Sequence, residues 1–380
     1  MRITDDWIRA DDLQRVLACL TGAGHRALLV GGCVRNALLG VAAGDIDIAT
    51  DADPAQVTGL AQAAGLRTVP TGIDHGTVTV VAGGHPFEIT TFRSDVETDG
   101  RRAVVEFTGS LAADAARRDF TMNALYADAS GTVIDPLGGL PDIAARRVRF
   151  VGRPGDRIRE DYLRILRFFR FHALYGDPDQ GLDPDGLAAC AANGAGIETL
   201  SRERIGHEMR KLLSAPDPAP GVAAMQATGI LARVLPGADC GALAPLVHLE
   251  AGTPGSAVRR LASLGGEDAA ERLRLSRDEA RRLQCLRSEI GAGAGPAELA
   301  YRHGAEIARD VLLLRGALLG QPLAPGWRAD VDRGAAAVFP VRAADLADRL
   351  SGPALGAKLR ALEARWIASD FELSREQLIA

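Results

Sequence analysis

Hydrophobic and polar positions follow two different patterns along the chain, and the pattern changes near residue 150. Before that point, short apolar runs are broken by Gly, Asp and Thr, which is typical of strands. We expect strands at Ala27–Val30, Asp45–Ala49, Thr77–Val81, Phe87–Thr91, Val104–Phe107, Tyr126–Ala129 and Val133–Ile134. Longer periodic segments predict helices at Trp7–Leu20, Val34–Leu39, Pro54–Ala64 and Leu111–Ala124. The combination indicates an α+β fold around a mixed or antiparallel sheet.

Beyond Pro154 the apolar residues recur three and four positions apart, as in Leu163, Leu166 and Phe169. This spacing predicts helices, and clusters of Pro and Gly divide them into separate segments. Ser201 is a suitable N-cap for a helix that runs to Leu213. We therefore expect a head at 1–150, a helical neck at 151–215, and a helical body and tail at 216–380.

Composition narrows the protein class. With 380 residues and 47% hydrophobic residues, the chain can bury a sizeable core in two or three units. The five cysteines are scattered and form no C-x-x-C pair, which suits reduced thiols in a cytoplasmic protein. No apolar run approaches 18 residues and no signal peptide is recognisable, so we expect neither membrane insertion nor export.

The net charge of −5 argues against a protein that coats nucleic acid through bulk positive charge. Local charge differs, because residues 146–170 hold nine arginines and three acids. Arginine is the default cation here, since 42 of the 44 basic residues are arginine. The position of an arginine is therefore more informative than its presence.

A pair of glycines, Gly31 and Gly32, follows an apolar run and precedes a predicted helix. Glycine allows close approach to a phosphate, and a helix start offers free N–H groups to an anion. Arg35 stands in the first turn, where the helix dipole disfavours a cation unless an anion is near. The pattern fits a phosphate-binding turn or an ordinary strand–turn–helix, and it is not a P-loop.

Two carboxylates, Asp45 and Asp47, stand at positions i and i+2 of a predicted strand and therefore share a face. Such a pair is unfavourable without a cation, and Mg²⁺ bound to oxygen ligands would relieve it. Alone, the pattern most often marks a solvated strand edge, but here it follows the glycine pair by 13 residues. Glu88, on another predicted strand, is either a third acid of this site or a surface residue.

Arginines occur at two further places that suit phosphate or base contact. Arg117 and Arg118 are adjacent and fit bidentate contact with a triphosphate, or a solvated turn with an Arg–Asp pair. A second group is spaced by three and forms one stripe on a predicted helix: Asp161, Arg164, Arg167 and Arg170. The stripe is either an exposed salt-bridged face or, because acids are few, a face for an anion. A carboxylate beside a guanidinium could also accept cytosine and adenine and reject uracil and guanine.

In order, these segments resemble the bacterial class II tRNA nucleotidyltransferase and poly(A) polymerase family. The matching stretches read VGGCVRNALLG, GDIDIAT, FEITTFR, RRDFTMNAL and REDYLRILRFFRF, and they cover about residues 26–172. The resemblance implies a polymerase-β-type head with helical neck, body and tail, and two-metal nucleotidyl transfer with Mg²⁺. It also implies metal ligands (Asp45, Asp47), a third acid (Glu88), nucleotide-binding residues (Gly31, Gly32, Arg35, Arg118) and base-reading or neighbouring residues (Asp161, Arg164, Arg167, Arg170).

Two segments favour the CCA-adding type, which extends tRNA with CTP and ATP. Gly72–Val78 has the form found in CCA-adding members, and Arg93–Ala116 is long enough for their flexible loop, with Gly100 and Arg101 near its middle. Poly(A) addition, CC-only or A-only addition, and an inactive RNA-binding protein are the alternatives. Asn36, where many members have Asp, departs from the family pattern.

Overall fold

The computed structural model describes residues 1–73, 76–99, 102–348 and 350–380. The chain forms two compact units, Met1–Pro236 and Gly237–Ala380, and each is considered by itself. The predictions for the loop and for the Gly72–Val78 segment fall partly on Asp74, His75, Gly100 and Arg101, which lie outside the described residues.

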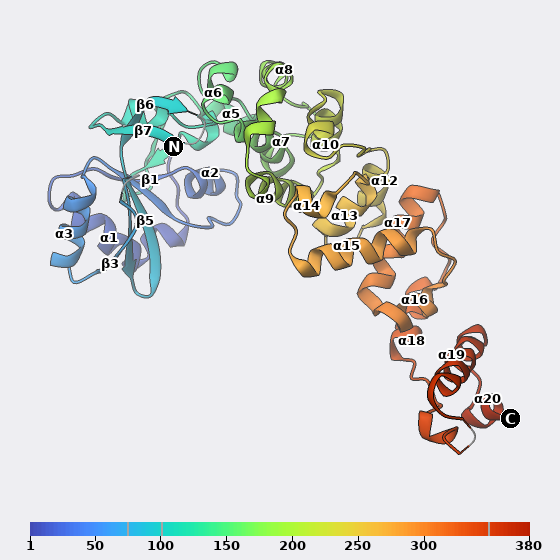
Figure 1. Ribbon diagram of the computed structural model, residues 1–380. Helices are drawn as coiled ribbons and strands as arrows, with labels where there is room; N and C mark the ends of the chain where they lie inside the picture. Colours follow the sequence, from blue (N-terminus) through green and yellow to red (C-terminus); the bar gives the residue numbers. More distant parts are fainter. Residues whose placement is uncertain (74–75, 100–101, 349) are drawn as a thin grey trace. The chain divides into compact units, whose positions relative to one another are not determined.

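A seven-stranded mixed sheet forms the framework of the first unit (Figure 1). Its spatial order is β3-β4-β5-β2-β1-β8-β9, with β2 and β5 parallel and the other neighbours antiparallel. The strands are β1 (Ala27–Val30), β2 (Asp47–Thr50), β3 (Arg67–Gly72), β4 (Thr77–Ala82), β5 (His85–Thr91), β8 (Tyr126–Ala127) and β9 (Val133–Ile134). β6 (Arg93–Asp99) and β7 (Arg102–Phe107) pair separately as a two-stranded ribbon. The predicted α+β fold with a mixed sheet is confirmed.

Helices cover both faces of this sheet. Those before residue 150 are η1 (Asp6–Arg9), α1 (Asp11–Thr21), α2 (Gly32–Leu38), α3 (Pro54–Ala63), α4 (Leu111–Ala116), η3 (Thr121–Asn123) and α5 (Leu140–Ala144). α1 and α3 pack on one face, as Figure 1 shows. On the other face Leu28, Val30 and Tyr126 join a buried cluster with Ala115 of α4 and Phe92.

Two strands were not predicted, and several predicted elements have other bounds; the helix predicted at Trp7–Leu20 is η1 followed by α1, and the strand predicted to reach Ala129 ends at Ala127. β3 was not predicted; it contains Pro70, which an edge strand with an irregular register tolerates. β6 is rich in charged residues and lacks strand alternation. The helix predicted to reach Ala124 ends at Ala116, because the Asp119 carboxylate accepts hydrogen bonds from the Phe120 N–H and the Asn123 amide and holds a turn there.

The remaining helices of the first unit follow the sheet. They are α6 (Pro154–Glu160), α7 (Leu163–Tyr175), α8 (Pro184–Ala192), η4 (Gly194–Thr199), α9 (Arg202–Leu213), α10 (Ala219–Ala227) and α11 (Ile230–Val234). An aromatic cluster connects α7 to the sheet region: Phe120 lies 4.9 Å, between ring centroids, from both Phe150 and Phe171, and Phe150 stacks on Phe168 at 5.4 Å. This shared core explains why the head and the first helices form one unit.

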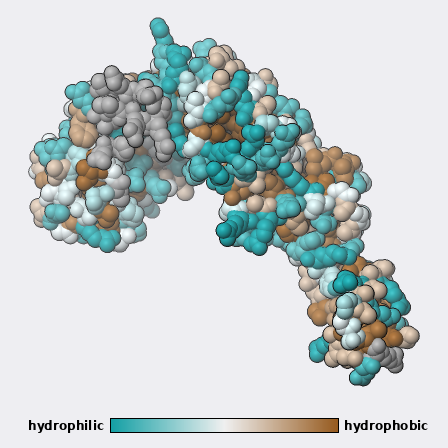
Figure 2. Space-filling model, in the orientation of Figure 1, coloured by the Kyte–Doolittle hydropathy of each residue, from teal (hydrophilic) through white to brown (hydrophobic). Residues whose placement is uncertain are grey.

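The second unit is helical throughout its described part. Its helices are α12 (Leu243–Leu249), α13 (Ala257–Leu264), α14 (Ala269–Arg272), α15 (Arg277–Ile290), α16 (Pro296–His303), α17 (Ala305–Leu319), α18 (Trp327–Ala336), η5 (Ala343–Asp345), α19 (Gly352–Ala368) and α20 (Arg375–Ile379). Trp366 centres a core of the last helices and meets Tyr301 edge-on. Hydrophilic residues cover most of the face drawn in Figure 2. No helix in the described ranges has the length and apolar character needed to cross a membrane.

Candidate nucleotidyl-transfer site

One row of residues crosses the centre of the sheet and carries the candidate carboxylates. Glu88 of β5 pairs with Asp47 of β2, Asp47 pairs with Val30 of β1, and Val30 pairs with Tyr126 of β8. Residues that pair directly on neighbouring strands project from the same face of a sheet. The structure therefore brings Asp47 and Glu88 side by side, as a third-acid role for Glu88 requires.

Asp45 precedes β2 and is exposed, so the predicted strand from Asp45 begins two residues later, at Asp47. The charges nevertheless act on one another. Burial, then the charge of Glu88 and more weakly that of Asp45, raise the pKa of Asp47 to about 6, while Arg118 opposes the rise. A carboxylate whose pKa is raised by burial and by neighbouring acids is suited to share a cation with them.

This carboxylate set fits a divalent ion, since hard oxygen donors converge and their charge is not balanced locally. Among the residues that the structure describes, no ion pair includes Asp45, Asp47 or Glu88. Within the described part of the chain, no group of three or more His, Cys, Asp or Glu side chains is already arranged to hold a metal ion. Mg²⁺ commonly binds to one or two carboxylates and completes its shell with substrate phosphates, so two converging acids suffice.

The glycine pair forms a tight turn between β1 and α2, directly beside the row. Gly31 has φ 71° and ψ −118°, a backbone conformation that favours glycine, and Gly32 begins α2. A Cβ atom placed on Gly31 would lie 3.5 Å from Nη1 of Arg118. The turn and the Arg118 guanidinium thus face one another next to Asp47.

Arg35 occupies a buried position with neutral partners. Its guanidinium donates to Asn36 Oδ1 at 2.8 Å, to Asn123 Oδ1 at 2.5 Å and to the Tyr175 hydroxyl at 2.8 Å. It also lies 4.0 Å above the Tyr175 ring and 5.1 Å from that of Phe171. Burial lowers its pKa. Asn36, which departs from the family pattern, is here an uncharged acceptor for Arg35.

Arg117 and Arg118 share one buried carboxylate. Asp114, four residues before Arg118 on α4, accepts from Arg117 Nε at 2.9 Å and from Arg118 Nη2 at 2.9 Å. The Tyr126 hydroxyl accepts from Arg118 Nε at 3.0 Å and donates to Asp114 at 2.6 Å. One carboxylate between two guanidiniums leaves net positive charge, which suits contact with a triphosphate.

The predicted continuous stripe from Asp161 to Arg170 is wrong for Asp161, which lies between α6 and α7 in extended conformation (φ −155°). Its carboxylate accepts from the Leu163 N–H and from Arg204 Nη2 at 2.6 Å, so it caps α7 from outside. Arg164 donates to Glu160 at 2.5 Å and to the backbone oxygens of Arg157 and Arg117. The two side chains proposed to read the base are thus each held by other groups.

The expectation that this arginine face lacks acids is also wrong, because its partners come from distant parts of the chain. Arg167 donates to Asp119 at 2.5 Å and Arg170 to Glu208 at 2.5 Å. Asp119 is buried in the turn after α4, and its pKa is held low, against the effect of burial, by Arg167. These pairs fix α7 against the head and against α9.

Comparison with known proteins agrees with this geometry. Residues 27–149 match the poly A polymerase head domain, and residues 181–240 match the probable RNA and SrmB-binding site of polymerase A. CCA tRNA nucleotidyltransferase 1, mitochondrial, of Homo sapiens is 46% identical over 190 residues, which are 50% of this chain and 44% of that protein. The CCA-adding enzyme of Streptococcus pyogenes is 43% identical over 219 residues, 56% of this chain and 53% of that enzyme.

A solved structure matches over a longer part of the chain. The crystal structure of the Bacillus stearothermophilus CCA-adding enzyme in complex with CTP has a TM-score of 0.75 and 29% identity, and covers 96% of this chain and 94% of that one. The chain is therefore similar to tRNA nucleotidyltransferases and poly(A) polymerases, in sequence over about its first half and in fold over most of its length. The aligned part spans about half the length of the curated relatives.

Most of the residues predicted to hold metal and triphosphate lie in the row, in the glycine turn or at Arg118. Sequence reasoning missed the groups that form hydrogen bonds with the predicted site residues. These groups are Asp114, Asp119, Tyr126, Glu160, Tyr175, Arg204 and Glu208. Asp114 and Glu160 had a local signal, because each stands four residues before its arginine, Arg118 or Arg164. The others meet their partners through tertiary packing.

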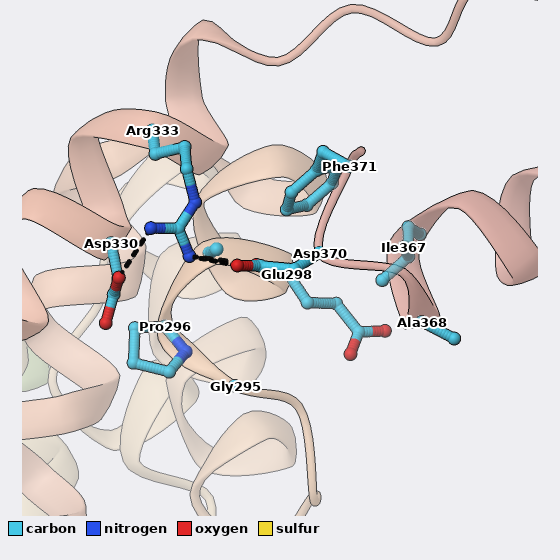
Figure 3. Close-up of a pocket in the computed structure, with 10 residues that line it drawn as sticks. Gly295, Pro296, Glu298, Asp330, Arg333, Ile367, Ala368, Asp370 and Phe371 are labelled. Atoms are coloured by element: carbon cyan, nitrogen blue, oxygen red, sulfur yellow. Dashed lines mark hydrogen bonds and ion pairs between the residues drawn. The ribbon is translucent and has the colours of Figure 1, made fainter. Parts of the chain in front are cut away.

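A pocket of about 400 Å³ lies in the second unit (Figure 3). It is lined by the start of α16, by α18 and by the end of α19 with the residues that follow it. Arg333 reaches between Asp330 and Asp370, donating to each at 2.8 Å, and the Glu298 carboxylate lines the same space. Three carboxylates around one guanidinium that is already paired do not suit a triphosphate. This pocket is therefore a poor candidate for a nucleotide site.

Proposed function

We propose that this protein adds CCA to the 3′ end of tRNA, using CTP and ATP with Mg²⁺ and without a template. The observation that carries the proposal is the cross-strand row, in which Asp47 and Glu88 lie side by side next to the glycine turn and Arg118. The names of the similar proteins, CCA tRNA nucleotidyltransferase and CCA-adding enzyme, and the CTP complex of the similar structure support the same activity.

The chemistry follows from the charges of these side chains. Asp45 and Asp47 would hold two Mg²⁺ ions, with Glu88 as the neighbouring acid; the bound ions supply positive charge at the α-phosphate and activate the RNA 3′ hydroxyl. The hydroxyl attacks the α-phosphate and pyrophosphate leaves. Gly31 and Gly32 would admit the phosphates close to the backbone, while Arg118 and Arg35 would supply cationic donors. Holding the groups in line contributes much of the rate.

Choice of base would rest on the corner between α6 and α7. We propose that Asp161 and Arg164 turn to the base when a nucleotide binds, exchanging their bonds with Arg204 and Glu160 for bonds to cytosine or adenine. Arg167 and Arg170, held by Asp119 and Glu208, would keep α7 in place near the nucleotide. In this exchange each of the two side chains would give up an ion pair and form a charge-assisted hydrogen bond to the base.

We also propose a role for each of three segments of the chain. Residues 1–150 would form the catalytic head, 151–215 the neck for base recognition, and 216–380 the body and tail that contact tRNA by shape and phosphate. We also propose a cytoplasmic location, which the five free cysteines support.

The test is to incubate the protein with a tRNA transcript that lacks CCA, giving CTP alone, ATP alone or both, and to sequence the new 3′ ends. We expect two C residues from CTP alone, nothing from ATP alone, and CCA from both. Addition of A to the transcript without prior C would instead indicate an A-adding or poly(A)-adding enzyme, and no addition under any condition would contradict nucleotidyl transfer to tRNA.

A further inference from the structure

Tyr126 is a buried residue of the candidate site to which the proposed function gives no role. It stands on β8, two strands from Asp47 in the same cross-strand row, and its side chain is fully buried. A buried phenol hydroxyl needs partners, and this one has two charged partners on α4 and at its end. The role of Tyr126 can therefore be inferred from these two partners, Arg118 and Asp114.

Three side chains, Asp114, Arg118 and Tyr126, form a closed hydrogen-bonded triangle, which we name the Arg118 clamp. Arg118 Nε donates to the Tyr126 hydroxyl at 3.0 Å, Arg118 Nη2 donates to Asp114 at 2.9 Å, and the Tyr126 hydroxyl donates to the same Asp114 oxygen at 2.6 Å. Two nitrogens of the planar guanidinium are thus fixed, which leaves its plane no freedom to rotate. The third nitrogen, Nη1, is the one near Gly31.

Charge in the clamp points toward an anion. Asp114 is buried and its pKa lies below the ordinary value, despite the opposing effect of burial, because Arg118 and Arg117 both act on it. Burial alone would lower the pKa of Arg118, but Tyr126 and Asp114 raise it. The clamp therefore keeps Arg118 charged in a buried place, while Asp114 divides its charge between two arginines.

We infer that Tyr126 is a positioning residue for the triphosphate: through the clamp it aims Arg118 Nη1 at the β- and γ-phosphates over the Gly31–Gly32 turn. The inference rests on the proposed function, because it assumes that a nucleoside triphosphate occupies this turn. Phenylalanine at 126 would keep the ring in its buried seat but remove the acceptor for Nε and one donor to Asp114. Arg118 would then keep its charge and lose its fixed direction.

The experiment compares binding of CTP and CMP to the wild type and to Tyr126→Phe by isothermal titration calorimetry, with Mg²⁺ present. We expect Tyr126→Phe to weaken CTP binding about 3- to 10-fold, as the net loss of one ordinary hydrogen bond implies, and to leave CMP binding within about twofold. CMP lacks the phosphates that Arg118 would contact, so a general loss of structure would weaken both ligands equally.

A matched control is Tyr301→Phe in the second unit, which also removes a hydroxyl that donates to a carboxylate, Glu363, at 2.6 Å. This control should bind CTP like the wild type. A double-mutant cycle shows whether Tyr126 acts through Arg118: in an Arg118→Ala background, Tyr126→Phe should have no further effect on CTP binding. An additional loss there would overturn the inference.

The outcomes separate the inference from the proposed function. If the wild type binds no CTP, the proposed function fails. If the wild type binds CTP and Tyr126→Phe binds it equally well, or loses CTP and CMP affinity to the same degree, only the positioning role of Tyr126 is overturned. The positioning role is supported if Tyr126→Phe weakens CTP binding but not CMP binding, and if this effect of Tyr126→Phe is absent in the Arg118→Ala background.

Discussion

Two groups of carboxylates in this protein, the buried acids of the second unit and the less buried acids around Asp47, are treated in opposite ways. In the second unit Glu250 accepts from Arg259 at 2.7 Å and from Arg260 at 2.9 Å, and Asp310 accepts from Arg259 at 2.7 Å and from Arg282 at 2.6 Å. In the first unit Asp47 meets the like charges of Glu88 and Asp45. Paired acids of the first kind hold helices together, whereas unpaired acids of the second kind need a ligand.

The difference explains why only one of the two clusters is a candidate for chemistry. The carboxylates of the second unit are saturated, so neither a metal nor a substrate gains by approaching them. Those beside the sheet are unfavourable in isolation, and that cost is recovered when a cation binds. The same isosteric change, Asp to Asn, should therefore have opposite consequences in the two places.

The largest effect is expected for Asp47→Asn in nucleotide addition. An amide cannot replace a carboxylate as ligand to a divalent ion, so the rate should fall by on the order of 1000-fold or more. Single-turnover incorporation of CMP into tRNA measures it. Asp332→Asn, which alters an exposed ion pair with Arg309, is the control and should keep the wild-type rate. Appreciable activity in Asp47→Asn would show that Asp47 is not an essential metal ligand.

Asp310→Asn should have the largest effect on stability. The change leaves Arg259 and Arg282 without their shared acid in a buried place, and the unfolding free energy should fall by about 3 to 5 kcal/mol. Urea denaturation followed by circular dichroism measures this, with Asp332→Asn again expected to stay within about 0.5 kcal/mol of the wild type. A loss below about 1 kcal/mol would show that the cluster is not a stabilising element.

Asp47→Asn should instead stabilise the metal-free protein at neutral pH. The folded pKa of Asp47, about 6, lies above its ordinary value of 3.8, so the folded state binds this proton more tightly than the unfolded state does. Stability is therefore lost as pH rises from about 4 to about 6, and the asparagine variant escapes this loss. We expect a gain of about 1 to 3 kcal/mol at pH 7 and little difference at pH 4.

Urea titrations of both proteins at pH 4, 5, 6 and 7 in EDTA would show whether the curves diverge in that direction. A pH-independent difference would mean that the raised pKa of Asp47 is not the cause. Saturating Mg²⁺ should reduce the difference, because it binds the wild-type carboxylate and stabilises the folded state.

A smaller effect is expected at the corner between α6 and α7. A Cβ atom on Gly196 would lie 2.0 Å from the Tyr162 ring, so Gly196→Ala must displace the residue next to Asp161. We expect U incorporation to rise relative to C by a few-fold to about tenfold, measured with competing UTP and CTP. Gly59→Ala on α3, where a Cβ meets nothing within 4 Å, should leave selectivity unchanged. If Gly196→Ala keeps the wild-type preference for C over U, the segment between α6 and α7 does not determine the choice of base.

Much of the head could be predicted from the sequence, because its strands are short apolar runs with clear ends. Ala27–Val30 and Val133–Ile134 lie where the pattern predicts them, and the shared face of Asp47 and Glu88 follows from strand spacing once the strands pair. The neighbouring position of β2 and β5 could not be read locally, since it depends on the crossover of β3 and β4 between them.

The arginine stripe shows the limit of a local pattern. Arg167 and Arg170 are paired with Asp119 and Glu208, which lie 48 and 38 residues away, and no spacing rule connects them. Asp161 leaves the helix because its carboxylate bonds to the Leu163 N–H and to Arg204, a choice made by tertiary contacts. Tyr126 was missed for the same reason, since its role depends on strand register.

The proposed function requires the unpaired carboxylates beside the sheet to bind divalent metal for nucleotidyl transfer. Titration of Mn²⁺ into the protein with CTP, followed by the loss of its free-ion signal in electron paramagnetic resonance, tests this most directly. We predict saturable Mn²⁺ binding to the wild type and to Asp310→Asn, weakened at least about tenfold in Asp47→Asn. Equal Mn²⁺ binding by the wild type and Asp47→Asn would contradict the claim.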